Sequence, residues 1–175
     1  MRTLCLFMGL ALLGCDERDN PTYAGEAYPI GPYGWAEGDT LPNWTFLDAE
    51  GSEVSMQLIR SSTTATTLVL LPSAPWMESS TSMLRRAATL HAEGREDVLI
   101  LSAVFEDANA RAAEVTDALA WQTTYDVPWE VVAEPLGQFR LAWRDDMRAA
   151  VLIDLTTMKR LDPDRRPGIR DVLWP

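Results

Sequence analysis

The chain has 175 residues and a formal net charge of −11 at pH 7, a size that fits one domain plus a tail. Its apolar fraction of 47% is enough to build a hydrophobic core. A surface this acidic repels nucleic acids and anionic membranes. The sequence also has no basic patch with interleaved aromatic residues, so nucleic-acid binding is excluded.

Thiols and imidazoles are almost absent from the chain. Its two cysteines, Cys5 and Cys15, both lie in the N-terminal segment, and His91 is the single histidine. The residues after position 15 therefore offer no thiol for a disulfide, a zinc site or redox chemistry. We expect neither a metal site nor a cofactor.

Residues 1–14 have the pattern of a cleaved export signal. Arg2 supplies a positive charge, and residues 3–13 form an apolar run that is shorter than the roughly 20 residues needed to span a bilayer. The ending Leu-Leu-Gly-Cys at residues 12–15 resembles the bacterial lipobox, which implies cleavage before Cys15 and a diacylglycerol group on its sulfur. An ordinary secretory peptide and a cytosolic apolar N-terminus are the two alternatives. The polar run directly after Cys15 favours the lipoprotein.

Residues 15–37 are predicted to be a flexible, lipid-anchored linker to a domain of residues 38–175. Proline and glycine recur in this stretch without a helical or strand period. Tyr23, Tyr28, Tyr33 and Trp35 are many aromatic residues for a pure spacer. They are expected either to dock on the domain or to bind a partner, and docking is the simpler interpretation.

Strand and helix patterns alternate along the predicted domain. Continuous apolar runs at residues 68–71 and 98–105 are typical of strands covered on both faces. Helical spacing at 79–93 and 108–123 predicts two helices, which we expect on opposite faces. Apolar and polar residues alternate over 38–51, a stretch that ends in a turn. Further strands are predicted at residues 53–59, 127–132 and 149–153, with a hairpin partner at 158–161. This order predicts an α/β domain in which a central mixed β-sheet is flanked by helices on both faces.

Three patterns together resemble one family. Residues 38–51 begin with Gly-Asp-x-Leu-Pro and lead into a hairpin, a Pro-containing loop ending in Trp76 joins the first buried strand to a helix, and Val-Leu-Ile-Asp closes a late strand at 151–154. The set resembles redoxin domains, the branch of the thioredoxin superfamily that contains peroxiredoxins and membrane-anchored cytochrome-maturation thioredoxins. The resemblance covers about residues 38–161 and implies a thioredoxin-like fold.

The same resemblance locates the family's active site, where its usual chemistry is missing. The family carries Trp-Cys-x-x-Cys at this junction, and the first cysteine is activated by the positive end of the helix dipole. Here residues 76–80 read Trp-Met-Glu-Ser-Ser, so Met77 and Ser80 fill both cysteine positions. Arg148 stands where the resemblance places a cis-proline that pairs with substrate. We therefore expect no catalytic residue.

Three functional hypotheses remain open. The first is a redox-inactive lipoprotein that is held to the membrane through Cys15, faces the periplasm or the exterior, and binds a protein or peptide at the bacterial cell envelope. The second is a thiol-disulfide oxidoreductase or a peroxiredoxin-type antioxidant enzyme, which would need thiols from a partner. The third is a structural envelope protein whose useful part is the aromatic tether.

The anchor can be tested by a single substitution. Cys15→Ala should abolish lipid attachment and normal cleavage, because no other cysteine lies at the end of the apolar run. Metabolic labelling with palmitate, followed by membrane fractionation, measures both effects. Absence of label from the wild type, or label that survives the substitution, would show that Cys15 is not the lipid site.

Overall fold

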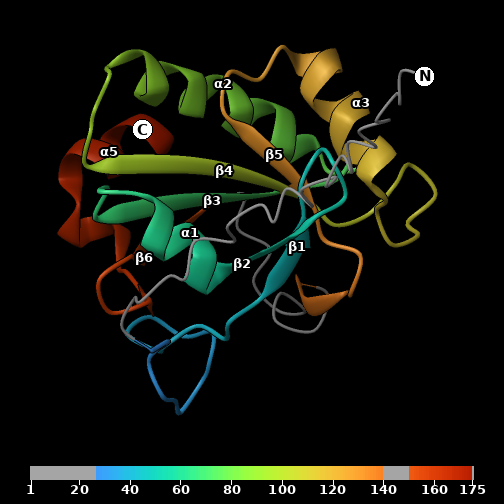
Figure 1. The fold of residues 1–175 in the computed structure, drawn as a ribbon. Helices are drawn as coiled ribbons and strands as arrows, with labels where there is room; N and C mark the ends of the chain where they lie inside the picture. The colour runs from blue at the N-terminus through green and yellow to red at the C-terminus, as the bar shows by residue number, and fades with distance from the viewer. Residues whose placement is uncertain (1–26, 140–149, 175) are drawn as a thin grey trace, which may run out of the picture.

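The computed structural model describes residues 27–139 and 150–174, which form one mixed sheet with helices on both faces (Figure 1). The seven strands lie in the order β2-β1-β5-β4-β3-β6-β7. This arrangement confirms the predicted α/β class. The strands are β1 (Thr45–Leu47), β2 (Glu53–Ser55), β3 (Thr67–Ser73), β4 (Val98–Val104), β5 (Glu130–Ala133), β6 (Val151–Asp154) and β7 (Lys159–Arg160). The helices are α1 (Met56–Ser62), α2 (Glu78–Ala92), α3 (Val115–Tyr125), the 3₁₀ turn η1 (Pro163–Arg165) and α5 (Pro167–Leu173).

β3 lies inside the sheet, between β4 and β6, and is buried at every residue. It pairs in parallel with β4 along its whole length and antiparallel with β6. Because side chains alternate across a strand, Leu68 and Leu70 enter one apolar core and Val69 and Leu71 enter the other. The two predicted central strands are therefore adjacent, as the continuous apolar runs indicated.

The helices α2 and α3 lie on the same face of the sheet, so the expectation of opposite faces was wrong. Buried residues of both helices, such as Leu84 and Trp121, share one core with Val69. The chain passes from β3 to β4 to β5 in a single direction across the sheet. Right-handed crossovers that move in the same direction place both helices on one side. The other face is covered by α1, whose Met56 and Ile59 enter the second core.

The helix predicted at residues 108–123 begins later, at Val115, because residues 107–112 form a tight loop. Both Asp107 carboxylate oxygens are used in this loop: Oδ1 accepts from the backbone N–H groups of Asn109 and Arg111, and Oδ2 accepts from the Arg111 guanidinium at 2.7 Å. These bonds offer the backbone an alternative to a helix. A capping box between Glu114 and Asp117 then starts α3.

The return strand predicted at residues 53–59 is also shorter than expected. It ends at Ser55, whose hydroxyl accepts a hydrogen bond from the backbone N–H of Leu58 at 3.1 Å and so caps α1. The remaining predicted residues, 56–59, are therefore the first turn of a helix. Within residues 27–139 and 150–174, no helix combines the length and the apolar character needed to cross a bilayer.

Part of the predicted linker packs on the domain. The Tyr28 hydroxyl donates to the carbonyl oxygens of Leu41 and Pro42, and the Trp35 ring lies 5.3 Å from that of Trp44. The Arg160 guanidinium donates a hydrogen bond to the Trp35 carbonyl and lies over the Trp35 ring. Two of the four aromatic residues of the linker are thus docked, whereas Tyr23 lies outside the described residues.

Candidate functional site

The junction between β3 and α2 places Met77 and Ser80 in the first turn of the helix. Met77 is the N-cap residue, with φ −93° and ψ 100°, and its side chain makes no capping hydrogen bond. The backbone N–H of Ser80 donates to the Met77 carbonyl at 3.0 Å. This bond closes a turn in which residues 77 and 80 are neighbours. Met77 is buried, at 8% exposure, whereas Glu78 beside it is exposed.

Trp76 lies at the rim of this junction and is held in place by a buried carboxylate. Its indole N–H donates to Oε2 of Glu106 at 3.0 Å, and its ring meets Phe105 edge-on at 6.0 Å. Glu106 lies two residues beyond the end of β4 and is 3% exposed. Trp76 itself remains 44% exposed. Trp76 therefore presents an apolar ring to solvent in a fixed orientation, because its indole N–H is hydrogen-bonded to the buried Glu106 carboxylate.

Ser80 is buried without a polar partner. Its side chain is 2% exposed, and within the part of the chain that the structure describes its hydroxyl makes no hydrogen bond. A buried hydroxyl in this state costs about 1–3 kcal/mol relative to a satisfied one. Among residues 27–139 and 150–174, no base or orienting group forms a hydrogen bond with the Ser80 hydroxyl, and their geometry gives it no nucleophilic role.

Glu134, a residue that the sequence analysis did not single out, is completely buried at the same end of the sheet. It follows β5, and its carboxylate accepts from the backbone N–H groups of Leu136, Gln138 and Phe139 and from the Gln138 amide. Burial nevertheless raises the pKa of Glu134 above its usual 4.5. The sequence did contain a signal for Glu134, because this acid directly follows the apolar run at residues 131–133. Glu106 follows the apolar run at 98–105 in the same way.

The carboxylates of Asp107 and Glu134 accept hydrogen bonds from the loops that follow them, so few of their oxygen lone pairs remain available for other chemistry. Hydrogen bonds from the Arg111 backbone, and then from its side chain, lower the pKa of Asp107 to about 2, so this carboxyl is fixed as an anion. The Glu134 carboxylate accepts four hydrogen bonds from the loop that follows β5. Among residues 27–139 and 150–174, no group of acids, histidines or cysteines is arranged to hold a metal ion.

Solved structures establish the fold, although no protein-family model and no curated protein match this sequence. A putative electron transfer protein from Aquifex aeolicus VF5 superposes with a TM-score of 0.58 at 13% identity, covering 78% of this chain and 98% of that one. A thiol-disulfide oxidoreductase from Bacteroides fragilis NCTC 9343 gives a TM-score of 0.56 at 14% identity, covering 71% and 88%. The domain has the thioredoxin-like fold.

A peroxidoxin, BcpB from Mycobacterium tuberculosis, superposes as well, with a TM-score of 0.55 at 13% identity over 78% of this chain and 95% of that one. At sequence identities this low, structural similarity supports a shared fold but does not establish a shared activity. Within the thioredoxin-like fold, the described site residues meet at one place: Trp76, Met77 and Ser80 lie together at the β3–α2 junction. Cys15 and Arg148 lie outside the described residues, so the predictions for them remain predictions.

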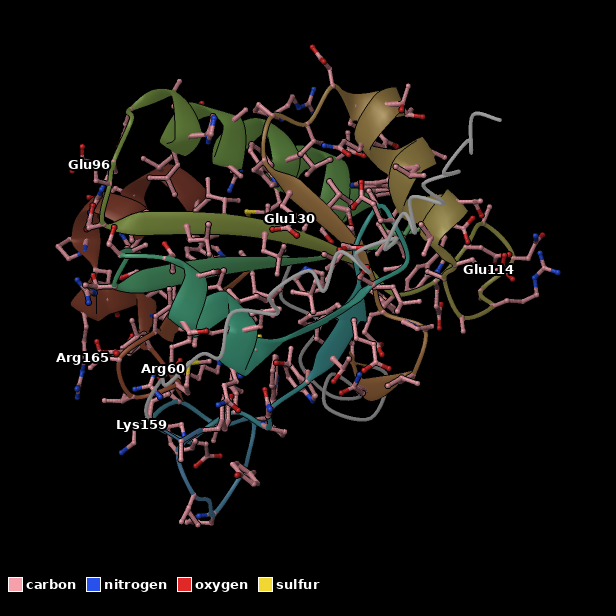
Figure 2. All side chains as sticks on the ribbon, in the orientation of Figure 1. Arg60, Glu96, Glu114, Glu130, Lys159 and Arg165 are labelled. Carbon is pink, nitrogen blue, oxygen red and sulfur yellow. The ribbon has the colours of Figure 1, made fainter. Side chains whose placement is uncertain are left out.

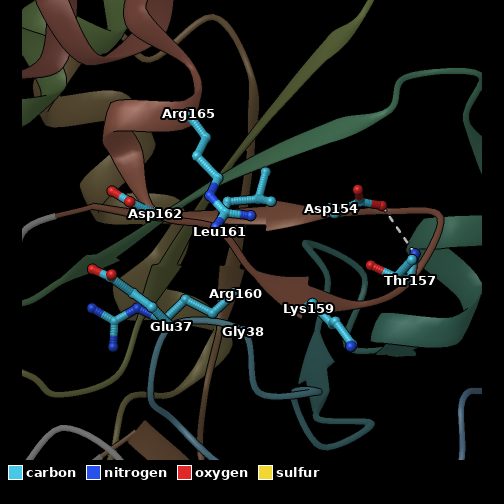
Figure 3. Close-up of a pocket in the computed structure, with 9 residues that line it drawn as sticks. All are labelled: Glu37, Gly38, Asp154, Thr157, Lys159, Arg160, Leu161, Asp162 and Arg165. Carbon is cyan, nitrogen blue, oxygen red and sulfur yellow. Dashed lines mark hydrogen bonds between the residues drawn. The ribbon is translucent and has the colours of Figure 1, made fainter.

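A hollow of about 470 Å³ lies at the opposite end of the thioredoxin-like sheet (Figure 3). Lys159 pairs with Asp154, which in turn pairs with Thr67 at the start of β3, whereas Trp76 follows the end of that strand. The two ends are therefore separated by β3, which is about 20 Å long at 3.3 Å per residue. The hollow is lined by Glu37, Gly38, Asp154, Thr157, Lys159, Arg160, Leu161, Asp162 and Arg165.

Because burial raises the pKa of Glu134, the free energy of unfolding should depend on pH in a measurable way. Because its pKa is raised in the folded state, the folded protein holds this proton more tightly than the unfolded chain. Its contribution should be fully present below about pH 4.5 and should be lost as the pH rises through the folded pKa. Glu134→Gln keeps a carbonyl acceptor but does not titrate. Urea unfolding of both proteins across this range should therefore show wild type losing stability relative to the variant as pH rises. Parallel curves would contradict the assignment.

Proposed function

We propose that this protein is a lipid-anchored, redox-inactive thioredoxin-like module that binds a protein or peptide at the bacterial cell envelope. The observation that carries the proposal is the placement of Met77 and Ser80 in the first turn of α2, in a chain with no cysteine after position 15. A thioether and a buried hydroxyl form no disulfide. The fold's reactive position is thus retained without its thiol.

The surface around that position suits binding. Trp76 at 44% and Leu136 at 66% exposure are large apolar side chains at the carboxyl ends of β3 and β5. Glu106 fixes the Trp76 indole, and Phe105 lies between the rings of Trp76 and Phe139, at 6.0 Å and 6.3 Å. A rigid aromatic anchor loses little conformational entropy when a partner covers it, which favours binding.

The second candidate is the oxidoreductase or peroxidase activity named for the similar structures. It is favoured by those names, which include a thiol-disulfide oxidoreductase and a peroxidoxin. Because the domain has no cysteine of its own, both thiols would have to come from a partner. We therefore place it second.

The missing chemistry can be tested by restoring it. Wild-type protein should neither reduce insulin disulfides nor consume peroxide. Met77→Cys combined with Ser80→Cys should form an intramolecular disulfide, because first-turn residues three apart are close enough to be bridged. Position 77 should also show a thiol pKa below the usual value of about 8.5. Alkylation of free thiols before and after oxidation measures the disulfide.

The single variant Met77→Cys is the matched control, since it should keep one free thiol under the same oxidation. Two thiols that persist in the oxidised double variant would mean that residues 77 and 80 are not the family's cysteine positions. Reductase activity in the wild-type protein alone would overturn the redox-inactive assignment.

Binding can be tested at the Trp76 surface. A photo-crosslinking benzoylphenylalanine in place of Trp76 should capture a discrete partner in native membranes. The same residue in place of Tyr125, an aromatic side chain of similar exposure on α3, should not. Mass spectrometry identifies the captured protein. Equal capture at both positions, or none at either, would argue against a binding site at Trp76.

A further inference from the structure

One segment at the edge of the domain exposes apolar side chains that the core does not use. Residues 27–38 project from the body as a loop at the bottom of Figure 1. Ile30 is 93% exposed and Tyr33 is 53% exposed, and Pro32 between them is exposed as well. An isoleucine this exposed contributes almost nothing to the stability of the folded domain.

The base of this loop is nevertheless held to the domain by backbone hydrogen bonds. Tyr33 forms a bridge with Thr40, which in turn bridges Lys159 in β7. The Tyr33 hydroxyl donates to the Pro29 carbonyl at 3.0 Å. The backbone N–H of Gly38 donates to the Arg160 carbonyl, and that of Arg160 donates to the Asp39 carbonyl. The exposed apolar residues are thus the tip of an ordered structure.

Cations border this tip. Lys159 is joined to the base of the tip through Thr40, and Arg165 lines the same hollow as Lys159, Glu37 and Gly38. Figure 2 shows Arg60, Lys159 and Arg165 on the same side of the molecule. Among the described residues, no carboxylate forms an ion pair with Lys159 or Arg165. We name the tip residues Pro29, Ile30, Pro32 and Tyr33, together with Arg60, Lys159 and Arg165, the tether face.

Acids also lie near this face, and they are mostly held by their own loops. Asp39 accepts from the backbone N–H of Ala36, Asp154 from those of residues 156 and 157, and Asp162 from that of Asp164. With Glu37 and Asp164 they number five, which balances Arg60, Lys159, Arg160, Arg165 and Arg170, the last of which pairs with Asp164. The chain as a whole carries −11. The excess negative charge therefore lies elsewhere, and an anionic surface is repelled less by the tether face than by the average surface of the chain.

The chain position of the segment indicates what covers it. Cys15 precedes Tyr28 by 13 residues, and a chain of that length reaches at most about 45 Å. A lipid on Cys15 would therefore hold the tether face near the membrane at a high effective concentration. Under that condition even a weak contact is populated.

We infer that the tether face rests on the headgroup region of a phospholipid bilayer, with Ile30 entering the interface and Lys159 and Arg165 meeting lipid phosphates. This inference rests on the proposed anchor at Cys15. Tyrosine suits the boundary between apolar chains and water, and basic side chains near it are attracted by anionic lipids. The contact turns the opposite end of β3, with Trp76, away from the membrane and toward soluble partners.

The absence of cysteine from the domain makes a direct test possible. The acylated full chain carrying Ile30→Cys, labelled with an environment-sensitive fluorophore, is reconstituted into mixed phosphatidylcholine–phosphatidylglycerol vesicles. Emission should shift to the blue, and nitroxide-bearing lipids should quench it several-fold more than for the matched label at Leu119→Cys on α3. Lys159→Glu should reduce the quenching at position 30, whereas Arg85→Glu, an exposed arginine of α2, should not.

The outcomes separate the two proposals. Vesicle flotation reports the anchor, so protein that fails to float overturns the anchor and not the contact. Protein that floats with equal quenching at positions 30 and 119 overturns the contact alone. A blue shift that grows with the density of protein in the vesicles, without lipid quenching, would assign the tether face to a second copy of the chain and would overturn the lipid assignment.

Discussion

The complete burial of β3 is the constraint on which the rest of this structure depends. A strand that is apolar on both faces and paired on both edges requires a neighbouring strand on each side and a helical layer above and below. β4 and β6 supply the edges, while α1 and the pair of α2 and α3 supply the layers. The direction of β3 also decides where the next residues emerge, which puts Trp76 and Met77 at its carboxyl end. The candidate site is therefore a consequence of how the core is covered.

The end of the sheet beside Trp76 is maintained by carboxylates. Glu106, Asp107 and Glu134 follow successive parallel strands, and each is buried. Asp107 and Glu134 satisfy backbone N–H groups of the loops that follow, and Glu106 orients Trp76. Burial of acids is costly unless donors surround them. That these residues are nonetheless present indicates that the shape of this end matters, which is consistent with the proposed recognition surface.

The sequence predicted the centre of the fold well and its connections poorly, for physical reasons. β3, β4 and α2 have strong local patterns, and residues 79–93 match Glu78–Ala92 within one position. The start of α3 was missed because Asp107 captures backbone donors that a helix would otherwise use, an effect that depends on the position of one carboxylate. The shared face of α2 and α3 depends on strand order, which no local pattern contains. Similarly, resemblance placed Trp76, Met77 and Ser80, but the role of Glu134 required the fold.

The two ends of β3 have different surroundings, and this difference supports a direction for the molecule. At one end, exposed Trp76 and Leu136 stand over buried acids. At the other, a loop with exposed Ile30 is bordered by Lys159 and Arg165. In a chain with a net charge of −11, charge repulsion opposes approach to an anionic bilayer in most orientations. The proposed anchor alone would leave the orientation free, whereas a locally neutral face with an apolar tip would select one. The proposed binding surface at Trp76, about 20 Å further along the sheet, would then be presented outward by the same strand that builds the core.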